Sequence, residues 1–193
     1  MRPKKFDADN VLRISMLLFW ERGYMGTSMD DITKATHLHK QSLYHAFGDK
    51  KSLFLKTLGF YYQEVMTRVG EIFSRQGEAP EHLQKMFDFF LGRSDVESCP
   101  NGCFVINTIS EFGQSDYNIK FALDQMEDEF EKILRNVVIT GQKEKTLTDK
   151  MKAEEIVDLL RSVLCGALIL RRKGNSVQNT RKITRQAVRS ICR

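Results

Sequence analysis

Proline is almost absent from this chain, and its scarcity limits what the chain can fold into. The 193 residues include three prolines, Pro3, Pro80 and Pro100. Proline removes a backbone donor and breaks a helix from within, so long stretches without it allow long helices. Apolar residues recur at helical spacing along most of the chain, and no segment shows the alternation of a half-buried strand. The sequence therefore predicts an all-α fold.

Four helices are predicted before residue 76, and two short ones with a tight turn between them lie inside this group. The second helix should begin with a capping box, in which a hydroxyl residue and an acid three positions later bond each other's backbone. Two pairs have this spacing, Thr27 with Asp30 and Ser28 with Asp31. The predicted ranges are 7–22, 29–35, 39–46 and 49–75.

The rest of the chain is predicted to form longer helices joined by short polar segments. A polar loop over residues 93–101 interrupts them. The helix after residue 149 carries a continuous apolar face, as expected of a helix packed in a core. The predicted ranges are 79–91, 103–112, 117–141, 150–172 and 176–191.

The sequence separates its charges. Residues 1–60 carry ten basic and six acidic side chains, whereas residues 61–170 carry twelve and nineteen. Residues 171–193 carry eight basic side chains and no acid, and the whole chain has a formal net charge of +5. A basic head on an acidic body suggests that the head binds a polyanion such as nucleic acid, although charge also fluctuates along any chain.

No run of 18 or more apolar residues occurs, so we expect no membrane span. The first ten residues lack the apolar core of a signal peptide. We therefore expect a cytoplasmic protein whose cysteines are thiols rather than disulfides. No motif calls for a cofactor. The cysteines are Cys99, Cys103, Cys165 and Cys192.

The most specific signal lies in residues 11–54, where several short elements follow one another in a fixed order. They are Leu18-Phe19, Glu21-Arg22-Gly23-Tyr24, Thr27-Ser28-Met29-Asp30-Asp31-Ile32, Lys34-Ala35, Lys40, Ser42-Leu43-Tyr44, Phe47, Lys50 and Leu53. Together they resemble the DNA-binding domain of TetR-family transcriptional repressors. Beyond residue 60 the resemblance is one of layout, a helical body that ends in two long helices.

The resemblance implies a helix-turn-helix DNA-binding domain over residues 1–48 and a helical regulatory and dimerisation domain over residues 49–193. It implies a homodimer formed through the last two long helices, where Gly166 and Ala167 would let helices approach closely. It also implies palindromic, double-stranded operator DNA as one partner and a small-molecule effector as another. Effector binding to the body would favour a different spacing of the two heads and weaken operator binding.

The candidate recognition helix offers side chains suited to the major groove, where a helix presents residues from its first turns to base edges. Gln41 is able to pair with adenine, and Lys40 with guanine or a phosphate. Leu43 and Phe47 lie four residues apart and should face the core. The candidate contacts in this helix are Lys40, Gln41, Ser42, Tyr44 and His45.

Phosphate contacts are expected around this helix. Thr27 and Ser28 lie at the start of the helix before it, where backbone N–H groups are available to an anion. Lys50 lies in a similar position near the start of the long helix that follows it. The resemblance implies phosphate contacts from Tyr44 and Lys50. A basic arm made of Arg2, Lys4 and Lys5 is a further candidate.

Two positions depart from the family's pattern. The turn usually holds a glycine, where this chain has His37, and a small hydroxyl residue usually caps the recognition helix, where it has His39. With His45, three histidines fall within nine positions, which raises the alternative of a metal site. Because no cysteine and no helical i, i+4 ligand pair lies nearby, we favour DNA contact or a plain surface role and expect no metal.

The body has two candidate sensing sites, each with a simpler explanation. Phe104, Asn107 and Glu111 lie in or beside an apolar helix and could line a ligand pocket, or could face solvent and cap helix ends. Cys99 and Cys103 could form a redox switch, or Cys103 could pack as a small apolar residue. We expect Cys165, on an apolar helix face, to be inert core.

The basic segment over residues 171–193 is a candidate second nucleic-acid contact, but we favour an amphipathic helix with a solvated basic face. Its expected apolar face is Val177, Ile183, Ala187, Val188 and Ile191. An enzyme is not expected, because the sequence lacks the motifs HExxH and GxSxG and a phosphate-binding loop. A helical protein-interaction module remains the alternative outside the regulator class, and salt-sensitive DNA binding would distinguish the two.

Overall fold

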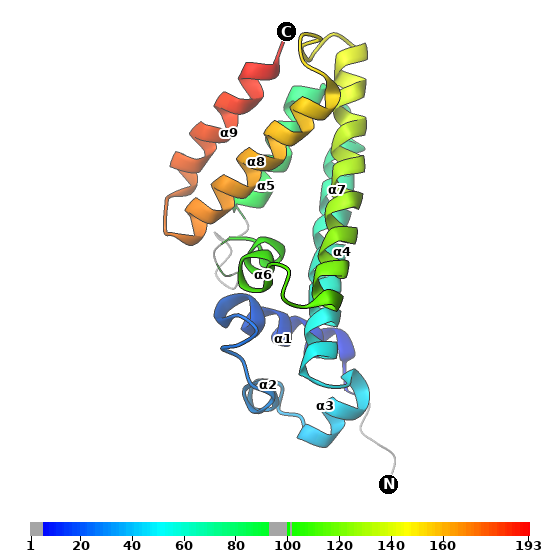
Figure 1. The fold of residues 1–193 in the computed structure, drawn as a ribbon, viewed down its shortest axis with the longest axis vertical. Coiled ribbons are helices and arrows are strands. Elements are labelled where there is room, and N and C mark those ends of the chain that lie inside the picture. Colours follow the sequence, from blue (N-terminus) through cyan, green and yellow to red (C-terminus); the bar gives the residue numbers. More distant parts are fainter. Residues whose placement is uncertain (1–5, 93–99, 101) are drawn as a thin grey trace.

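The computed structural model describes residues 6–92, 100 and 102–193, and this part of the chain is helical (Figure 1). No strand occurs among these residues, and an isolated bridge pairs Leu147 with Cys192. The all-α prediction is confirmed, and the predicted helix ends lie within three residues of the observed ones. The helices are α1 (Ala8–Arg22), α2 (Met29–Thr36), α3 (Lys40–Phe47), α4 (Lys50–Phe73), α5 (Ala79–Gly92), α6 (Phe104–Phe112), α7 (Tyr117–Lys143), α8 (Ala153–Arg172) and α9 (Val177–Ile191).

The helices form a small head and a longer body (Figure 1). Helices α1, α2 and α3 make the head, and α1 packs along the start of α4. In the body α4 and α7 lie lengthwise beside each other, while α8 and α9 pair and cover α5. Helix α6 lies between head and body. None of the described helices combines the length and apolar character that a membrane crossing requires.

Local capping bonds explain where several helices begin. Of the two candidate capping boxes, Ser28 with Asp31 forms: Asp31 N–H donates to Ser28 Oγ at 3.1 Å, and Ser28 N–H donates to Asp31 Oδ2 at 2.8 Å. These bonds from Ser28 lower the pKa of the Asp31 carboxyl. Asp7 and Asp49 accept backbone N–H groups in the same way at the starts of α1 and α4.

The amphipathic interpretation of the last helix is confirmed. Helix α9 buries Val177, Val188 and Ile191 against α5 and α8, and its Arg181 pairs with Asp88 at 2.8 Å. Ile183, expected on the apolar face, is instead 44% exposed. It lies on the side of the helix turned away from the body's core.

The expected contact residues on α8 fall on two different faces. Gly166 is exposed, and a Cβ added there would meet nothing within 4 Å. Ala167 is 1% exposed within the single chain, where it packs with Leu91 and Val177. The small side chain of Ala167 therefore allows close packing within its own chain, and its expected role in the approach of a partner helix stays a prediction.

Replacement of Gly141 is expected to destabilise the fold. A Cβ there would lie 2.6 Å from the Cβ of Ala79 and 2.8 Å from the Cδ1 of Leu147, closer than carbon atoms pack. We expect Gly141→Ala to lower the free energy of unfolding by about 1–3 kcal/mol, measured by chemical denaturation at fixed protein concentration. The control is Gly70→Ala at an exposed position of α4, where the added Cβ meets nothing within 4 Å. There we expect the free energy of unfolding to rise by about 0.5–1 kcal/mol. Equal effects of the two changes would contradict this account.

Candidate nucleic-acid interface and ligand cavity

The turn between α2 and α3 has the backbone of a helix-turn-helix despite its unusual residues. His37 adopts the left-handed conformation, with φ 55° and ψ 25°, and so takes the shape that glycine adopts most readily. His39 occupies the cap position of α3 in extended conformation, and its side chain makes no capping bond. The backbone therefore accommodates both histidines, and the helix-turn-helix arrangement of α2 and α3 is preserved.

Two apolar side chains anchor α3 to the rest of the head. Leu43 is fully buried and Phe47 is 4% exposed, as their spacing predicted. Lys56 of α4 adds a polar anchor, because its Nζ donates to the carbonyls of Ala46 and Phe47 at 3.4 and 3.3 Å. A cation at a helix C-terminus satisfies carbonyls that have no partner in the helix. Sequence reasoning missed Lys56, since its role depends on another helix lying nearby.

The opposite side of α3 carries the predicted contact residues. Lys40 Nζ lies 2.9 Å from Asp30 Oδ1 in the first turn of α2. This bond raises the pKa of the Lys40 ammonium. Ser42 is half-buried at the edge of this face. The exposed members are Lys40, Gln41, Tyr44 and His45.

The two residues expected to offer N–H groups at the start of α2 are both occupied. Thr27 is 1% exposed, its hydroxyl donates to Gly23 O at 2.8 Å, and its N–H donates to Tyr24 O at 3.3 Å. The prediction that Thr27 contacts DNA is therefore wrong, and the residue instead fastens the turn after α1. Ser28 is exposed, but its N–H is held by Asp31 in the capping box.

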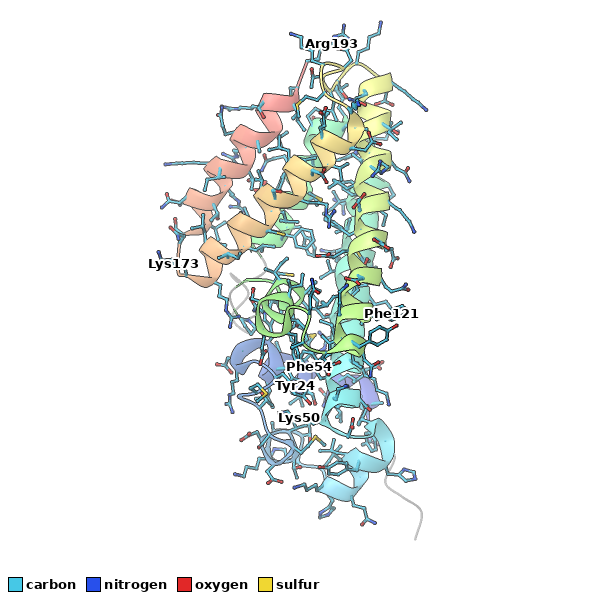
Figure 2. The ribbon with its side chains drawn as sticks, in the orientation of Figure 1. Tyr24, Lys50, Phe54, Phe121, Lys173 and Arg193 are labelled. Carbon is cyan, nitrogen blue, oxygen red and sulfur yellow. The ribbon has the colours of Figure 1, made fainter. Side chains whose placement is uncertain are left out.

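Lys50 lies at the junction of head and body. Its Nζ is 4.1 Å from the centre of the Tyr24 ring, a cation–π distance, and Tyr24 packs on Phe54 (Figure 2). Burial raises the pKa of the Tyr24 phenol, which therefore stays neutral beside the lysine. The predicted basic arm lies outside the described residues; it consists of Arg2, Lys4 and Lys5.

The three clustered histidines do not form a metal centre with other ligands. His37, His39 and His45 are all exposed. Among the described residues, no group of three or more His, Cys, Asp or Glu side chains is placed to hold a metal ion.

The body contains a largely apolar cavity of about 90 Å³ that is partly open to solvent. Helix α6 contributes its first turn through Cys103, Val105 and Ile106. A mainly apolar and aromatic lining with a few polar groups is typical of small-molecule sites. The remaining lining residues are Tyr61, Tyr62, Val65, Met66, Phe90, Met126, Glu127, Phe130, Arg161, Leu164, Cys165 and Leu168.

None of the three predicted ligand residues lines this cavity. Phe104 is 2% exposed and packs on Trp20 and Phe54. Phe104, Asn107 and Glu111 instead line a separate cleft between the end of α1 and α6. The three residues are thus brought together, but on another side of α6 from the cavity, and their contact with a ligand stays a prediction.

Glu111 connects α6 to the head. Its carboxylate accepts the N–H groups of Tyr24 and Met25, both at 2.9 Å, in the turn that follows α1. A second bridge joins Lys51 of α4 to Asp116 at the start of α7, at 2.8 Å. Helix α6 therefore touches the cavity at its first turn and the head at its last.

The described cysteines are free thiols in different surroundings. Cys103 is buried and its Sγ accepts the Tyr61 hydroxyl at 3.2 Å. Cys165, expected to be inert core, is half-buried on the cavity wall, and burial raises the pKa of its thiol. The predicted redox pair of Cys99 with Cys103 stays a prediction, because Cys99 lies outside the described residues.

Comparison with known proteins places these features in a family. Residues 12–57 match the sequence model of bacterial regulatory proteins of the tetR family, and residues 79–187 match the tetracyclin repressor-like C-terminal domain. The chain is 25% identical over 189 residues to the HTH-type transcriptional repressor ComR of Escherichia coli, a match that covers 97% of this chain and 90% of that protein. It is also 30% identical over 110 residues to the uncharacterised HTH-type regulator YezE of Bacillus subtilis, covering 57% of each.

Solved structures share the whole fold. A cysteine mutant of the TetR-family regulator CifR, complexed with a 26-bp operator, superposes with a TM-score of 0.87 at 24% identity, covering 99% of this chain and 100% of that one. A TetR-family regulator from Agrobacterium tumefaciens gives a TM-score of 0.87 at 20% identity, covering 96% and 97%. With the C-terminal match alone spanning more than half of the sequence, the chain belongs to the TetR family of bacterial regulatory proteins.

Proposed function

We propose that this protein is a transcriptional repressor that binds palindromic operator DNA as a homodimer and is released by a small-molecule effector. The observation that carries the proposal is α3, which is held by buried Leu43 and Phe47 and exposes a face of hydrogen-bonding side chains. The name of ComR as a repressor and the operator complex of CifR support the same function. On this proposal the protein acts in the cytoplasm and by binding rather than by catalysis.

The residues of the interface take separate roles in this proposal. Lys40 and Gln41, in the first turn of α3, read base edges in the major groove. Tyr44, His45 and Lys50 meet phosphates, and Ser42 supports them from the edge of the helix. In a two-fold dimer the half-sites lie about 34–36 Å apart, or a multiple of this, because both α3 helices must enter the same face of the duplex.

The dimer is proposed to form through the outer faces of α8 and α9. Ile169 is 54% exposed and Ile183 is 44% exposed, whereas most large apolar side chains of the two helices are buried. Gly166 leaves space on the same helix for close approach of a second chain. The bonds from the Tyr24 and Met25 N–H groups to Glu111 join the proposed DNA-binding domain, residues 1–48, to the regulatory domain, residues 49–193.

One prediction of the proposed function concerns operator recognition. We expect Gln41→Ala to cost about 1–3 kcal/mol of discrimination at one base-pair position. Lys50→Ala should weaken binding to all sequences and reduce the slope of log affinity against log salt by about 1. Both are measured by titrating DNA selected from random sequences at two salt concentrations.

The matched control is Lys143→Ala, which removes an exposed charge from the last turn of α7, at the end of the body away from the head (Figure 1). It should leave operator affinity unchanged. Failure of the wild-type protein to select any sequence would contradict the repressor proposal and favour a protein-interaction module.

A second prediction concerns the Asp30–Lys40 ion pair. Operator binding requires Lys40 to leave a carboxylate that lies 2.9 Å away and that itself repels phosphates. We expect Asp30→Asn to raise affinity for unrelated DNA by roughly threefold or more, and so to reduce selectivity. Asp9→Asn makes the same charge change in the first turn of α1. An equal gain from both variants would mean that net charge alone is responsible.

A third prediction concerns coupling through Glu111. An amide oxygen in Glu111→Gln cannot replace both carboxylate oxygens, so one N–H of the turn after α1 loses its acceptor. We expect amide hydrogen exchange at Tyr24 or Met25 to become roughly tenfold faster, with operator binding retained in the absence of effector. Ser110→Ala, at the preceding exposed position, is the control. Unchanged exchange at both amides would show that Glu111 does not hold the head.

A further inference from the structure

The cavity described above has one charged wall in an otherwise apolar lining. Its rings come from Tyr61, Tyr62, Phe90 and Phe130, on three different helices. The charged wall is formed by Glu127 of α7 and Arg161 of α8. The net charge of this wall determines whether the cavity favours a cation or an anion.

Arg161 is already paired with Glu131, a carboxylate that does not line the cavity. Arg161 Nη1 lies 2.6 Å from Glu131 Oε2, whereas its Nη2 is 3.8 Å from Glu127 Oε2. Glu131 also accepts from Arg135 at 2.7 Å, and Arg135 pairs in addition with Glu154. The strong bonds of the network therefore lie on the side of Glu131, away from the cavity wall.

Three carboxylates share two guanidinium groups in this network, so one negative charge is left over. Among the described residues, the charged partner of Glu127 is Arg161 at the long distance of 3.8 Å. The excess charge consequently falls on Glu127, which is also the carboxylate that lines the cavity. Its side chain is 41% exposed, so solvent weakens its field without removing it.

The surroundings favour the same sign of ligand. The Tyr62 hydroxyl donates to Met126 O at 2.8 Å, and burial with the neighbouring Glu129 carboxylate raises its pKa, so its proton is not free to bind an anion. Aromatic faces attract cations through their quadrupole. An anion entering the cavity would compete with Glu131 for Arg161 and would lie beside Glu127, an arrangement of like charges that costs free energy.

We propose that the cavity binds an organic cation with an apolar or aromatic body, its positive group against Glu127 and its body among the aromatic and thioether side chains. This inference rests on the proposed function, in which the cavity receives the effector. Such a ligand would also touch Val105 and Ile106, in the first turn of the helix whose last turn holds the head through Glu111.

The experiment compares two probes of similar shape and opposite charge, benzyltrimethylammonium and benzylsulfonate, on the full-length protein by calorimetric titration. The cation should bind about tenfold more tightly than the anion, because both the carboxylate and the rings favour it. In Glu127→Gln the difference should largely disappear. Asp124→Asn removes a charge from the same helix at an exposed position outside the cavity and should preserve it.

Location is tested by alkylation of thiols followed by peptide mass spectrometry. The cation should slow modification of Cys165, on the cavity wall, and leave that of exposed Cys192 unchanged. Thermal unfolding of each variant checks that it is folded.

Equal or tighter binding of the anion, binding of neither probe at millimolar concentration, or a preference that survives Glu127→Gln would overturn the inference. Operator binding by the unliganded protein is measured separately. If the protein binds its operator but fails the ligand tests, the result contradicts the proposed ligand class alone. If it passes the ligand tests but binds no DNA, the result contradicts the proposed repressor function.

Discussion

The Phe54 ring lies where α1, α4 and α6 meet, and the arrangement of head and body depends on its burial (Figure 2). Ring centres of Phe19, Tyr24, Phe104 and Phe112 lie 5.1–5.7 Å from its own. Edge-to-face contacts of this kind add to the hydrophobic free energy of burying large rings and also fix relative orientation. Head and body consequently share one continuous core rather than being joined by a flexible linker.

This shared core makes α6 the element through which a cavity ligand could act on the head. The helix is short, its first turn lines the cavity, and its last turn binds the backbone after α1. A close-packed core transmits a small displacement because its side chains have little free volume. A ligand would shift the head only if it bound one arrangement of α6 more tightly than another.

Charge has different uses at the two ends of the molecule. In the head, the exposed Lys40 is paired with Asp30. This ion pair weakens the attraction of Lys40 to phosphates in the free protein. In the body the ion-pair network between α7 and α8 joins the two helices and leaves one carboxylate on the cavity wall. In both proposals an acidic residue sets the selectivity of the neighbouring site.

Residue types and their spacing predict the helices, their order and the exposed face of α3. These depend on local rules: apolar spacing, capping residues and the i, i+4 pairing of Leu43 with Phe47. The sequence also carries the family's pattern in the head, because that pattern consists of neighbouring residues.

Which surface each helix turns to its neighbours follows from tertiary packing, because it depends on residues far apart in the chain. Tertiary packing buried Thr27, which we expected to contact DNA, and enclosed Ala167 within its own chain. It placed Glu111 on the head rather than in the cavity and brought Lys56 to the end of α3. The cavity itself comes from five helices, and a void between helices leaves no signal in the spacing of residues along any one of them.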